Sequence, residues 1–245
     1  MPTSERTDIS MFEVGTLKDV GGLWAGVRER VEVLAGRRGA SKIFGASDHG
    51  FALAAPLAEE QLRGWEARAG VTLPIQYRSF LTEVAAAGAG PNYGLLGFGV
   101  TDGIAHWVGD PWRGPERLNL RTVFPHRDAF QPVLPDSVPE LEAGQFDTPA
   151  AHAEAERQRA ELVQTLQERE ETDTHGTIPL AHQGCGYYDL LVVNGPDAGH
   201  IWFDGRAADG PISPQTDDDG RITFDRWYLT WLARAEEQCA PHATP

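Results

Sequence analysis

The sequence is short of basic residues. Its 245 residues include 21 lysines and arginines against 36 aspartates and glutamates, which gives a formal net charge of −15 at pH 7. Proteins bind nucleic acid largely by replacing its counterions with lysine and arginine, so this balance argues against nucleic acid as a partner. An anionic membrane surface repels an acidic chain for the same electrostatic reason. The charge instead favours a protein partner with a basic surface.

Cysteine is scarce as well. The chain has two cysteines, Cys185 and Cys239, and they lie far apart in the sequence. Neither belongs to a Cys-x-x-Cys pair, so no disulfide framework or cysteine-based zinc site is predicted, and a reducing compartment fits best. The first eight residues lack the apolar core of a signal peptide. No apolar run reaches the ~18 residues of a membrane span, so we expect a cytoplasmic protein.

The short motifs that hold cofactors and metals are missing. The glycine-rich run at 94–99 is not the Gly-x-Gly-x-x-Gly of a dinucleotide site, and there is no Walker-type Gly-Lys-Ser/Thr. The eight histidines are dispersed and none belongs to a His-Glu-x-x-His motif. The acidic runs at 168–173 and 217–220 lack the alternating carboxylates of an EF-hand. The sequence therefore predicts no cofactor and no metal ion.

Three helices are predicted in the first 90 residues. Apolar residues three and four positions apart predict the first, at 17–36. The second runs from about residue 58 to 69 and ends at Gly70, because glycine commonly follows the last helical residue. Pro74 suits the first position of the third helix, which is expected to end at Gly88. The first helix is expected to bury Val20, Leu23, Trp24, Val27, Val31 and Leu34.

The strongest strand signals come after residue 175. Segments 177–181, 187–193 and 200–204 are apolar and rich in β-branched and aromatic residues, and a turn at 194–199 joins the last two as a hairpin. Weaker strand signals lie at 93–98, 105–108 and 120–124. Thr223 is expected to cap a final helix that buries Phe224, Trp227, Tyr228, Trp231, Leu232 and Ala235. Helices, then strands, then a closing helix is an α+β order and not an alternating β-α-β series.

An acidic segment interrupts this pattern. Residues 125–147 contain four prolines and indicate a loop, and a polar helix is predicted at 151–171 after Thr148 and Pro149. Residues 128–173 contain twelve acidic and three basic residues. We interpret about 126–175 as a surface insertion in a domain at 51–237. A helical extension at 1–50 precedes this domain, and a flexible tail at 238–245 follows it.

A cysteine-dependent hydrolase is the main enzymatic alternative. Cys185 would be the nucleophile, and His182 or His200 the base. Such an enzyme needs the thiol and imidazole at hydrogen-bond distance, with a third group that orients the base. No third group is evident in the sequence, and a turn with a small, half-buried cysteine explains the same residues. We therefore expect no enzyme activity.

Five segments, read in order, match one family pattern. The run 73–81 reads Leu-Pro-Ile-Gln-Tyr-Arg-Ser-Phe-Leu, with Trp65-Glu66 before it and the glycine-rich 88–95 after it. A Gly…Gly-x-Ile-Trp-x-Asp hairpin lies at 195–204, and Phe-x-x-Trp-Tyr-x-x-Trp-Leu at 224–232. This arrangement resembles the SUKH superfamily, the Smi/Knr-type cell-wall-regulator group, over about 53–99 and 177–233. The motif residues are Trp65, Leu73, Pro74, Tyr77, Phe80, Leu81, Gly90, Gly94, Gly195, Gly199, Trp227 and Trp231.

The resemblance implies an α+β fold with a mostly antiparallel sheet flanked by helices, and no enzyme activity. Most bacterial members resemble immunity proteins that bind and block a toxin domain, often a nuclease, whereas fungal members resemble signalling scaffolds. We therefore expect an immunity-type inhibitor of a basic toxin domain, with a regulatory scaffold or adaptor as the alternative. The candidate partner-binding residues are Tyr93, Tyr187, Trp202 and Asp204, with the acidic residues Asp217, Asp218, Asp219, Glu168, Glu170 and Glu171.

Overall fold

The structure is a computed structural model that describes residues 22–111, 118–132, 141, 145–146, 148–239, without the side chains of 166–171. Helices and antiparallel sheets together confirm the α+β class. The helices are α1 (Val27–Leu34), α2 (Ala46–His49), α3 (Glu59–Ala69), α4 (Ile75–Glu83), α5 (Pro149–Asp173) and α6 (Phe224–Gln238). The strands are β1 (Phe98–Thr101), β2 (Ile104–Trp107), β3 (Thr177–Gly184), β4 (Tyr187–Val192), β5 (Ile201–Asp204), β6 (Ile212–Pro214), β7 (Thr216–Asp217) and β8 (Gly220–Arg221).

The central sheet has the order β3-β4-β5-β6, and every neighbouring pair is antiparallel. Its β3 edge is covered by residues 93–96, since Leu96 N–H donates to the Leu180 carbonyl at 2.7 Å. Its β6 edge is covered by Phe130, which forms a bridge with Ile212. Covered edges leave few free backbone groups for unwanted strand pairing.

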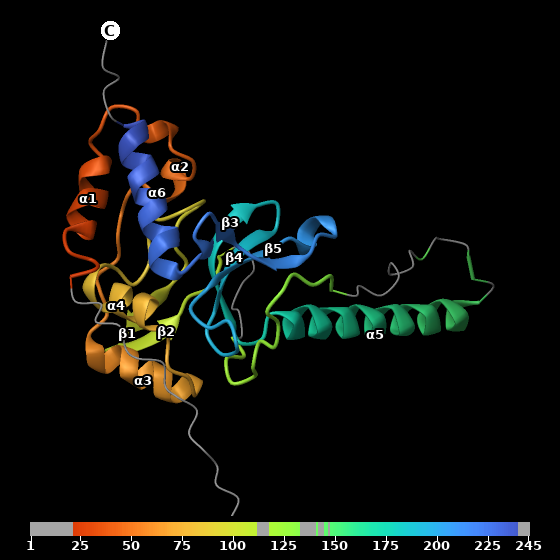
Figure 1. Ribbon diagram of the computed structural model, residues 1–245. Helices are drawn as coiled ribbons and strands as arrows, with labels where there is room; N and C mark the ends of the chain where they lie inside the picture. The colour runs from red at the N-terminus through yellow and green to blue at the C-terminus, as the bar shows by residue number, and fades with distance from the viewer. Residues whose placement is uncertain (1–21, 112–117, 133–140, 142–144, 147, 240–245) are drawn as a thin grey trace, which may run out of the picture.

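The two faces of this sheet have different covers. Leu191 and Val193 of the β4 segment face the main hydrophobic core, together with α1, α4 and α6, which gather on one side of the sheet (Figure 1). Leu190 and Val192 face a smaller cluster on the opposite side, built with Phe124. This alternation of side chains is the period of two that an extended strand imposes.

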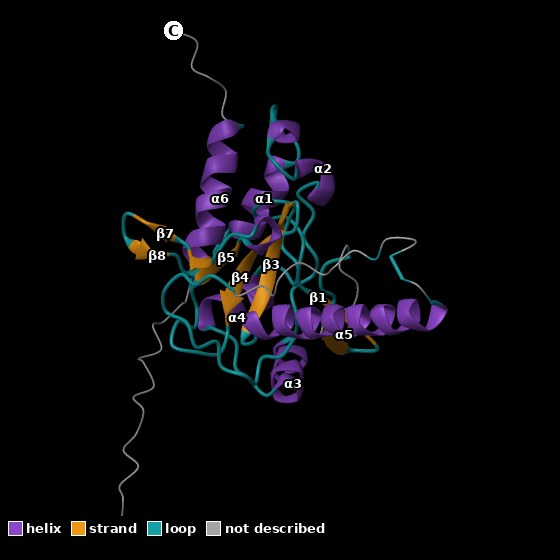
Figure 2. Cartoon of the chain, turned by 90° about the vertical axis from the view of Figure 1, so that its right-hand side faces the viewer, coloured by secondary structure: helices purple, strands orange, loops and turns teal. Residues whose placement is uncertain are grey.

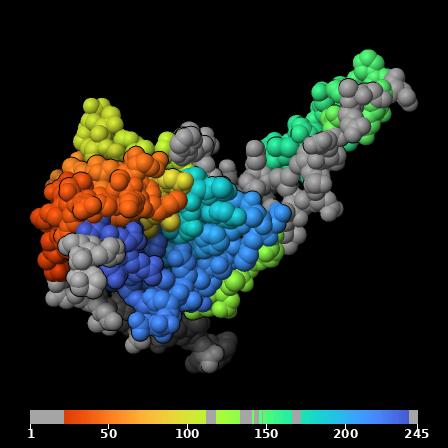
Figure 3. All heavy atoms as spheres, turned by 90° about the horizontal axis from the view of Figure 1, so that it is seen from above, coloured from red at the N-terminus to blue at the C-terminus, as the bar shows by residue number. Residues whose placement is uncertain are grey.

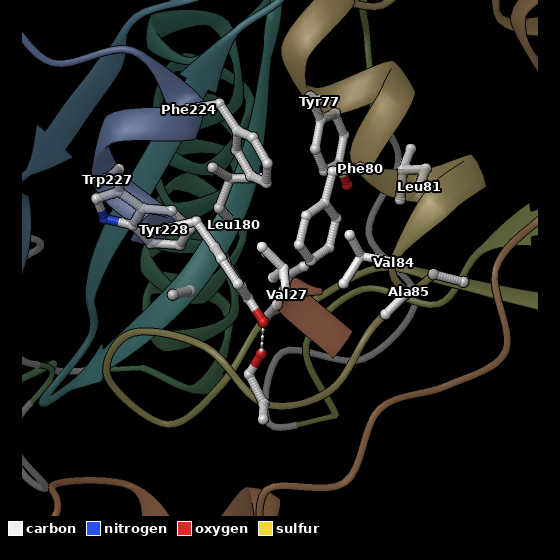
Figure 4. Close-up of a cluster of buried hydrophobic side chains, with 14 of the residues drawn as sticks. Val27, Tyr77, Phe80, Leu81, Val84, Ala85, Leu180, Phe224, Trp227 and Tyr228 are labelled. Atoms are coloured by element: carbon white, nitrogen blue, oxygen red, sulfur yellow. Dashed lines mark hydrogen bonds between the residues drawn. The ribbon is translucent and has the colours of Figure 1, made fainter. Parts of the chain in front are cut away.

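Aromatic side chains from α4 and α6 fill the main core (Figure 4). The rings of Phe80 and Tyr228 lie 4.5 Å apart, and those of Tyr77 and Phe224 lie 4.8 Å apart. The hydroxyl of Tyr228 donates to the carbonyl of Ala89 at 2.8 Å, which ties α6 to the glycine-rich loop. The motif residues Trp65, Leu73, Tyr77, Phe80, Leu81 and Trp227 are all buried.

Residues 22–50, part of the expected extension, belong to the main core. Trp24 packs on Phe80, with ring centroids 5.1 Å apart, and its indole N–H donates to Ser79 at 2.8 Å. The guanidinium of Arg28 donates to three backbone carbonyls, of Leu53, Ala54 and Val84. These contacts fix the N-terminal segment against α4.

The structure corrects two N-terminal predictions. The helix expected at 17–36 begins only at Val27, because Gly26 has a left-handed backbone (φ 71°) that an α-helix does not continue through. Its Val20 lies outside the described residues. Gly45 and Gly50 in the sequence predict a loop at 45–50, whereas the structure has the short helix α2 there.

Further differences concern helix ends and weak strands. Pro74 stands just before α4 and not at its first position, and α4 ends at Glu83 and not at Gly88. Residues 93–97 pair with β3 but form no named strand, and 120–124 form none, although Phe124 is buried. Trp231 is only half-buried on α6. Gly94, Gly195 and Gly199 all have positive φ, as turns require.

The helix α5 extends away from the sheet and its helices (Figures 1 and 3). It was expected at 151–171 and spans Pro149–Asp173. Thr148 caps it, since its hydroxyl oxygen accepts the Ala151 N–H at 3.2 Å. At the other end Arg206 lies 3.9 Å from the carboxylate of Asp173. Among the described helices none has the length and apolar character needed to cross a membrane.

The packing of Trp24 leads to a stability prediction. Trp24→Ala should lower the free energy of unfolding by about 3–5 kcal/mol, the usual cost of removing a buried tryptophan. The control Val33→Ala removes an exposed apolar side chain from α1 and should change it by no more than about 0.5 kcal/mol. Urea denaturation measures both. Equal effects would mean that residues 22–50 do not share the core.

Candidate functional site

The most unusual polar feature of the core is the carboxylate of Asp189, in the middle of β4. It is almost fully buried, on the sheet face that α6 covers. Asn92 donates to it at 2.6 Å and Gln183 at 2.7 Å, and the Gln215 amide and the Trp227 indole donate as well. A buried carboxylate is tolerated when such donors replace its water. We call these five residues the Asp189 cluster.

The donors of the Asp189 cluster come from four different segments. Asn92 belongs to the loop before β1, Gln183 to β3, Gln215 to the link from β6 to β7, and Trp227 to α6. Burial raises the pKa of Asp189 from 3.8 to about 6, while the four hydrogen bonds oppose this rise. One carboxylate therefore fixes the relative positions of a loop, a strand, a hairpin and a helix.

Two half-buried aromatic rings flank the cluster on the same face of the sheet. Tyr187 precedes Asp189 by two residues, and Phe203 is the cross-strand partner of Asp189 on β5. Their rings are stacked, with centroids 5.6 Å apart and an interplanar angle of 25°. Of the expected anchors, Tyr187 is therefore partly accessible, and it shares this face with the half-buried amides of Gln183 and Gln215.

A second aromatic group lies at the β3 edge. Tyr93 is 39% exposed and Phe44 is 56% exposed, and their ring centroids are 5.0 Å apart. The ring of Tyr93 also lies 5.7 Å from that of His182. Gly45 allows this approach, because its left-handed backbone (φ 77°) comes so close to Asn92 that a Cβ atom would lie 1.7 Å from the Asn92 oxygen. Tyr93, one of the expected partner-binding residues, is therefore accessible, and its ring contacts that of Phe44.

The acidic turn of Asp217, Asp218 and Asp219 is exposed, on the β7–β8 hairpin beside α6 (Figure 2). Arg226 of α6 pairs with Asp217 and, at 3.5 Å, with Asp219. One positive charge therefore offsets part of the three negative ones. The turn begins two residues after Gln215, so the Asp189 cluster anchors its base. The side chains of Glu168, Glu170 and Glu171 lie outside the described part of the chain.

Two of the expected partner-binding residues are buried and are corrected here. Trp202 has 0% exposure on the sheet face opposite Asp189, and its indole N–H donates to Asp197 at 2.6 Å. Asp204 is also buried, and its carboxylate accepts two hydrogen bonds from the Arg206 guanidinium, at 2.8 and 2.6 Å. Because neither side chain reaches the surface, neither can be a contact anchor in this conformation.

Cys185 lies in the β3–β4 turn and is exposed. The His182 Nε2 atom accepts the backbone N–H of Gly186 at 3.3 Å. The imidazole is also stacked on Tyr188, with centroids 4.9 Å apart. His200 contacts Asp197 instead, at 3.3 Å. Within the described residues no interaction joins Cys185 to either histidine, and the geometry does not favour the hydrolase alternative.

No group of three or more metal-binding side chains occurs among the residues that the structure describes. The donors around Asp189 are amides and an indole, which present N–H groups to the carboxylate. The arrangement suits macromolecular contact: rigid aromatic rings, half-buried amides and exposed carboxylates on adjoining segments.

Comparisons with family models, with curated proteins and with solved structures found no match. The candidate site therefore stands on the geometry of this chain. Sequence reasoning missed Phe44 and most of the Asp189 cluster. A signal for Asp189 was present, since it is the one acidic residue in the apolar run 187–193, and a charge at a core position needs partners.

The Asp189 cluster leads to a second stability prediction. Asp189→Ala leaves four donors without their acceptor, and each unsatisfied buried donor costs about 1–3 kcal/mol unless water reaches it. We expect the free energy of unfolding at pH 7 to fall by about 3 kcal/mol. Asp218→Ala, an exposed aspartate nearby, is the matched control and should change it by less than about 0.5 kcal/mol.

The raised pKa of Asp189 predicts the pH dependence of this difference. Because the folded pKa of about 6 exceeds the unfolded 3.8, the native state binds more protons between these values. The proton-linked part of this residue's contribution to stability is therefore full below pH 3.8 and is lost as pH rises through 6. The deficit of Asp189→Ala should grow by about 2 kcal/mol from pH 7 to pH 4. Chemical denaturation at several pH values tests this, and a constant deficit would contradict it.

Proposed function

We propose that this protein is a non-enzymatic, immunity-type inhibitor that binds and neutralises a toxin domain with a basic surface, within the cytoplasm. The resemblance of five segments to the SUKH superfamily supports this proposal, as does the net charge of −15. The observation that carries it is the exposed acidic turn at 217–219, which begins two residues after Gln215 of the Asp189 cluster.

Charge and aromatic contact have separate roles in such an inhibitor. The acidic surface attracts a basic partner from a distance and raises the association rate, up to about 10⁸–10⁹ M⁻¹s⁻¹ at low salt. Affinity comes from the desolvated centre, where tyrosine and other aromatic residues dominate. Many nuclease toxins are basic where they meet phosphate, so an acidic inhibitor can occupy that same surface.

A regulatory adaptor is the second candidate function, and α5 is the observation that favours it. Most of its described side chains are exposed, and it extends away from the sheet (Figure 3). A helix that is polar all round and stands free of the core offers a separate surface for another protein. An adaptor of this kind would require α5 for its activity, whereas the inhibitor would not.

Co-expression tests the proposed function. The toxic domain encoded beside this gene in its native genome would be expressed alone and together with this protein. The proposal expects growth to be restored and the two proteins to co-purify as a complex. The adaptor function would be favoured instead if no neighbouring domain is toxic or if co-expression leaves toxicity unchanged.

The acidic turn leads to a kinetic prediction. Asp218→Asn with Asp219→Asn should slow association with the toxin domain several-fold at low salt and leave dissociation nearly unchanged, because exposed charges act mainly at long range. Asp217 is retained because it also accepts the Asp219 N–H at 2.9 Å. Surface plasmon resonance at low and high salt measures both rates.

The matched control is Glu29→Gln with Glu60→Gln, which removes two exposed negative charges from α1 and α3. This control should reduce the association rate less, since its charges lie away from the proposed face. Equal rates for the two double variants would mean that the acidic turn is not part of the recognition surface.

A further inference from the structure

The exposed aromatic pair of Phe44 and Tyr93 is the strongest unassigned surface feature. The two rings come from segments 49 positions apart in sequence and lie 5.0 Å from each other. Phe44 is among the most exposed large apolar side chains of the described residues. Because exposing an aromatic ring to water is unfavourable, two such rings in contact are typical of an interaction site.

The aromatic pair is rigidly held. The Tyr93 N–H donates to the His182 carbonyl at 3.2 Å, and the preceding side chain, Asn92, donates to Asp189. The Tyr93 ring rests on Gly184, where an added Cβ would lie 3.3 Å from it. Gly45 fixes Phe44 against the same loop. A contact surface that is ordered before binding loses little conformational entropy when a partner arrives.

We propose that the Phe44–Tyr93 pair receives an arginine side chain of the basic partner. This inference rests on the proposed function and names the chemistry at the centre of its interface. A guanidinium stacks on aromatic faces and is more weakly hydrated than an ammonium, so it is preferred to lysine at such a site. The net charge of −15 favours a cationic occupant, and in the chain around Phe44 the exposed carboxylate of Asp48 balances the exposed Lys42.

A second copy of this chain is a poorer occupant of the same surface. Two chains that each carry a charge of −15 repel one another. The aromatic pair carries no positive charge that could neutralise the acidic surface of a second copy. A cation above the rings is attracted both by the ring quadrupole and by the negative charge of the whole chain.

Short peptides test the arginine preference without the natural partner. Hexa-arginine and hexa-lysine carry equal charge, so their affinities for the intact chain differ only through the chemistry of the side chain. We expect hexa-arginine to bind about two- to five-fold more tightly, the range of an exposed cation–π contact. Isothermal titration calorimetry at one fixed salt concentration measures both affinities.

Two substitutions locate the preference. Phe44→Leu keeps an apolar side chain but removes one of the two π faces, and it should reduce the difference between the peptides. Val33→Leu, at an equally exposed apolar position on α1, should preserve it. Equal binding of both peptides to the wild-type protein, or an unchanged preference in Phe44→Leu, would overturn the proposal.

The toxin complex provides the second test through Cys185, which follows Gly184 under the Tyr93 ring. Cys239 is buried, so alkylation of the intact protein reports mainly on Cys185. Binding at the aromatic pair should slow this alkylation at least several-fold, and Phe44→Leu should speed dissociation. A complex that forms while Cys185 stays fully reactive would overturn this inference but keep the proposed function. If the protein prefers hexa-arginine but does not neutralise the toxin domain, the proposed function is contradicted and the arginine site is retained.

Discussion

The candidate face of this protein depends on one buried carboxylate. Asp189 is buried on β4, and among the described residues no cation acts on its pKa, so its charge is tolerated because four neutral groups donate to it. Those groups come from the loop before β1, from β3, from the link to β7 and from α6. Tyr93 directly follows Asn92, and the acidic turn of Asp217, Asp218 and Asp219 begins two residues after Gln215. One electrostatic requirement thus holds the segments that precede both kinds of contact.

Local periodicity predicted much of the fold. The hairpin of β4 and β5, the helices α3 and α6, and the polar helix α5 all follow from spacing and turn residues that lie within each segment. Local periodicity failed where a single backbone angle or a strand far away in the sequence decides the structure. The left-handed conformation of Gly26 starts α1 late, and residues 93–97 become an edge segment because β3, about 85 residues further on, offers hydrogen bonds.

The candidate site was harder to predict, because burial depends on which face of the sheet is covered. Trp202 and Phe203 are adjacent and equally aromatic, yet Phe124 and Asp197 enclose the first, and the second stays half-buried. No local sequence pattern marks Phe44 as a contact residue. Its role is inferred from its contact with Tyr93, which only the folded loop brings near. The acidic charge and the aromatic residues of the sequence predict a binding protein, but the contact residues can be identified only once the fold is known.

Hydrogen exchange of the free protein and of its complex with the proposed toxin domain would locate the interface without any substitution. We expect slower exchange in the complex at residues 43–45, 92–94, 183–187 and 216–219. Slower exchange confined to α5 or to the β1–β2 hairpin, with those four segments unchanged, would contradict this expectation.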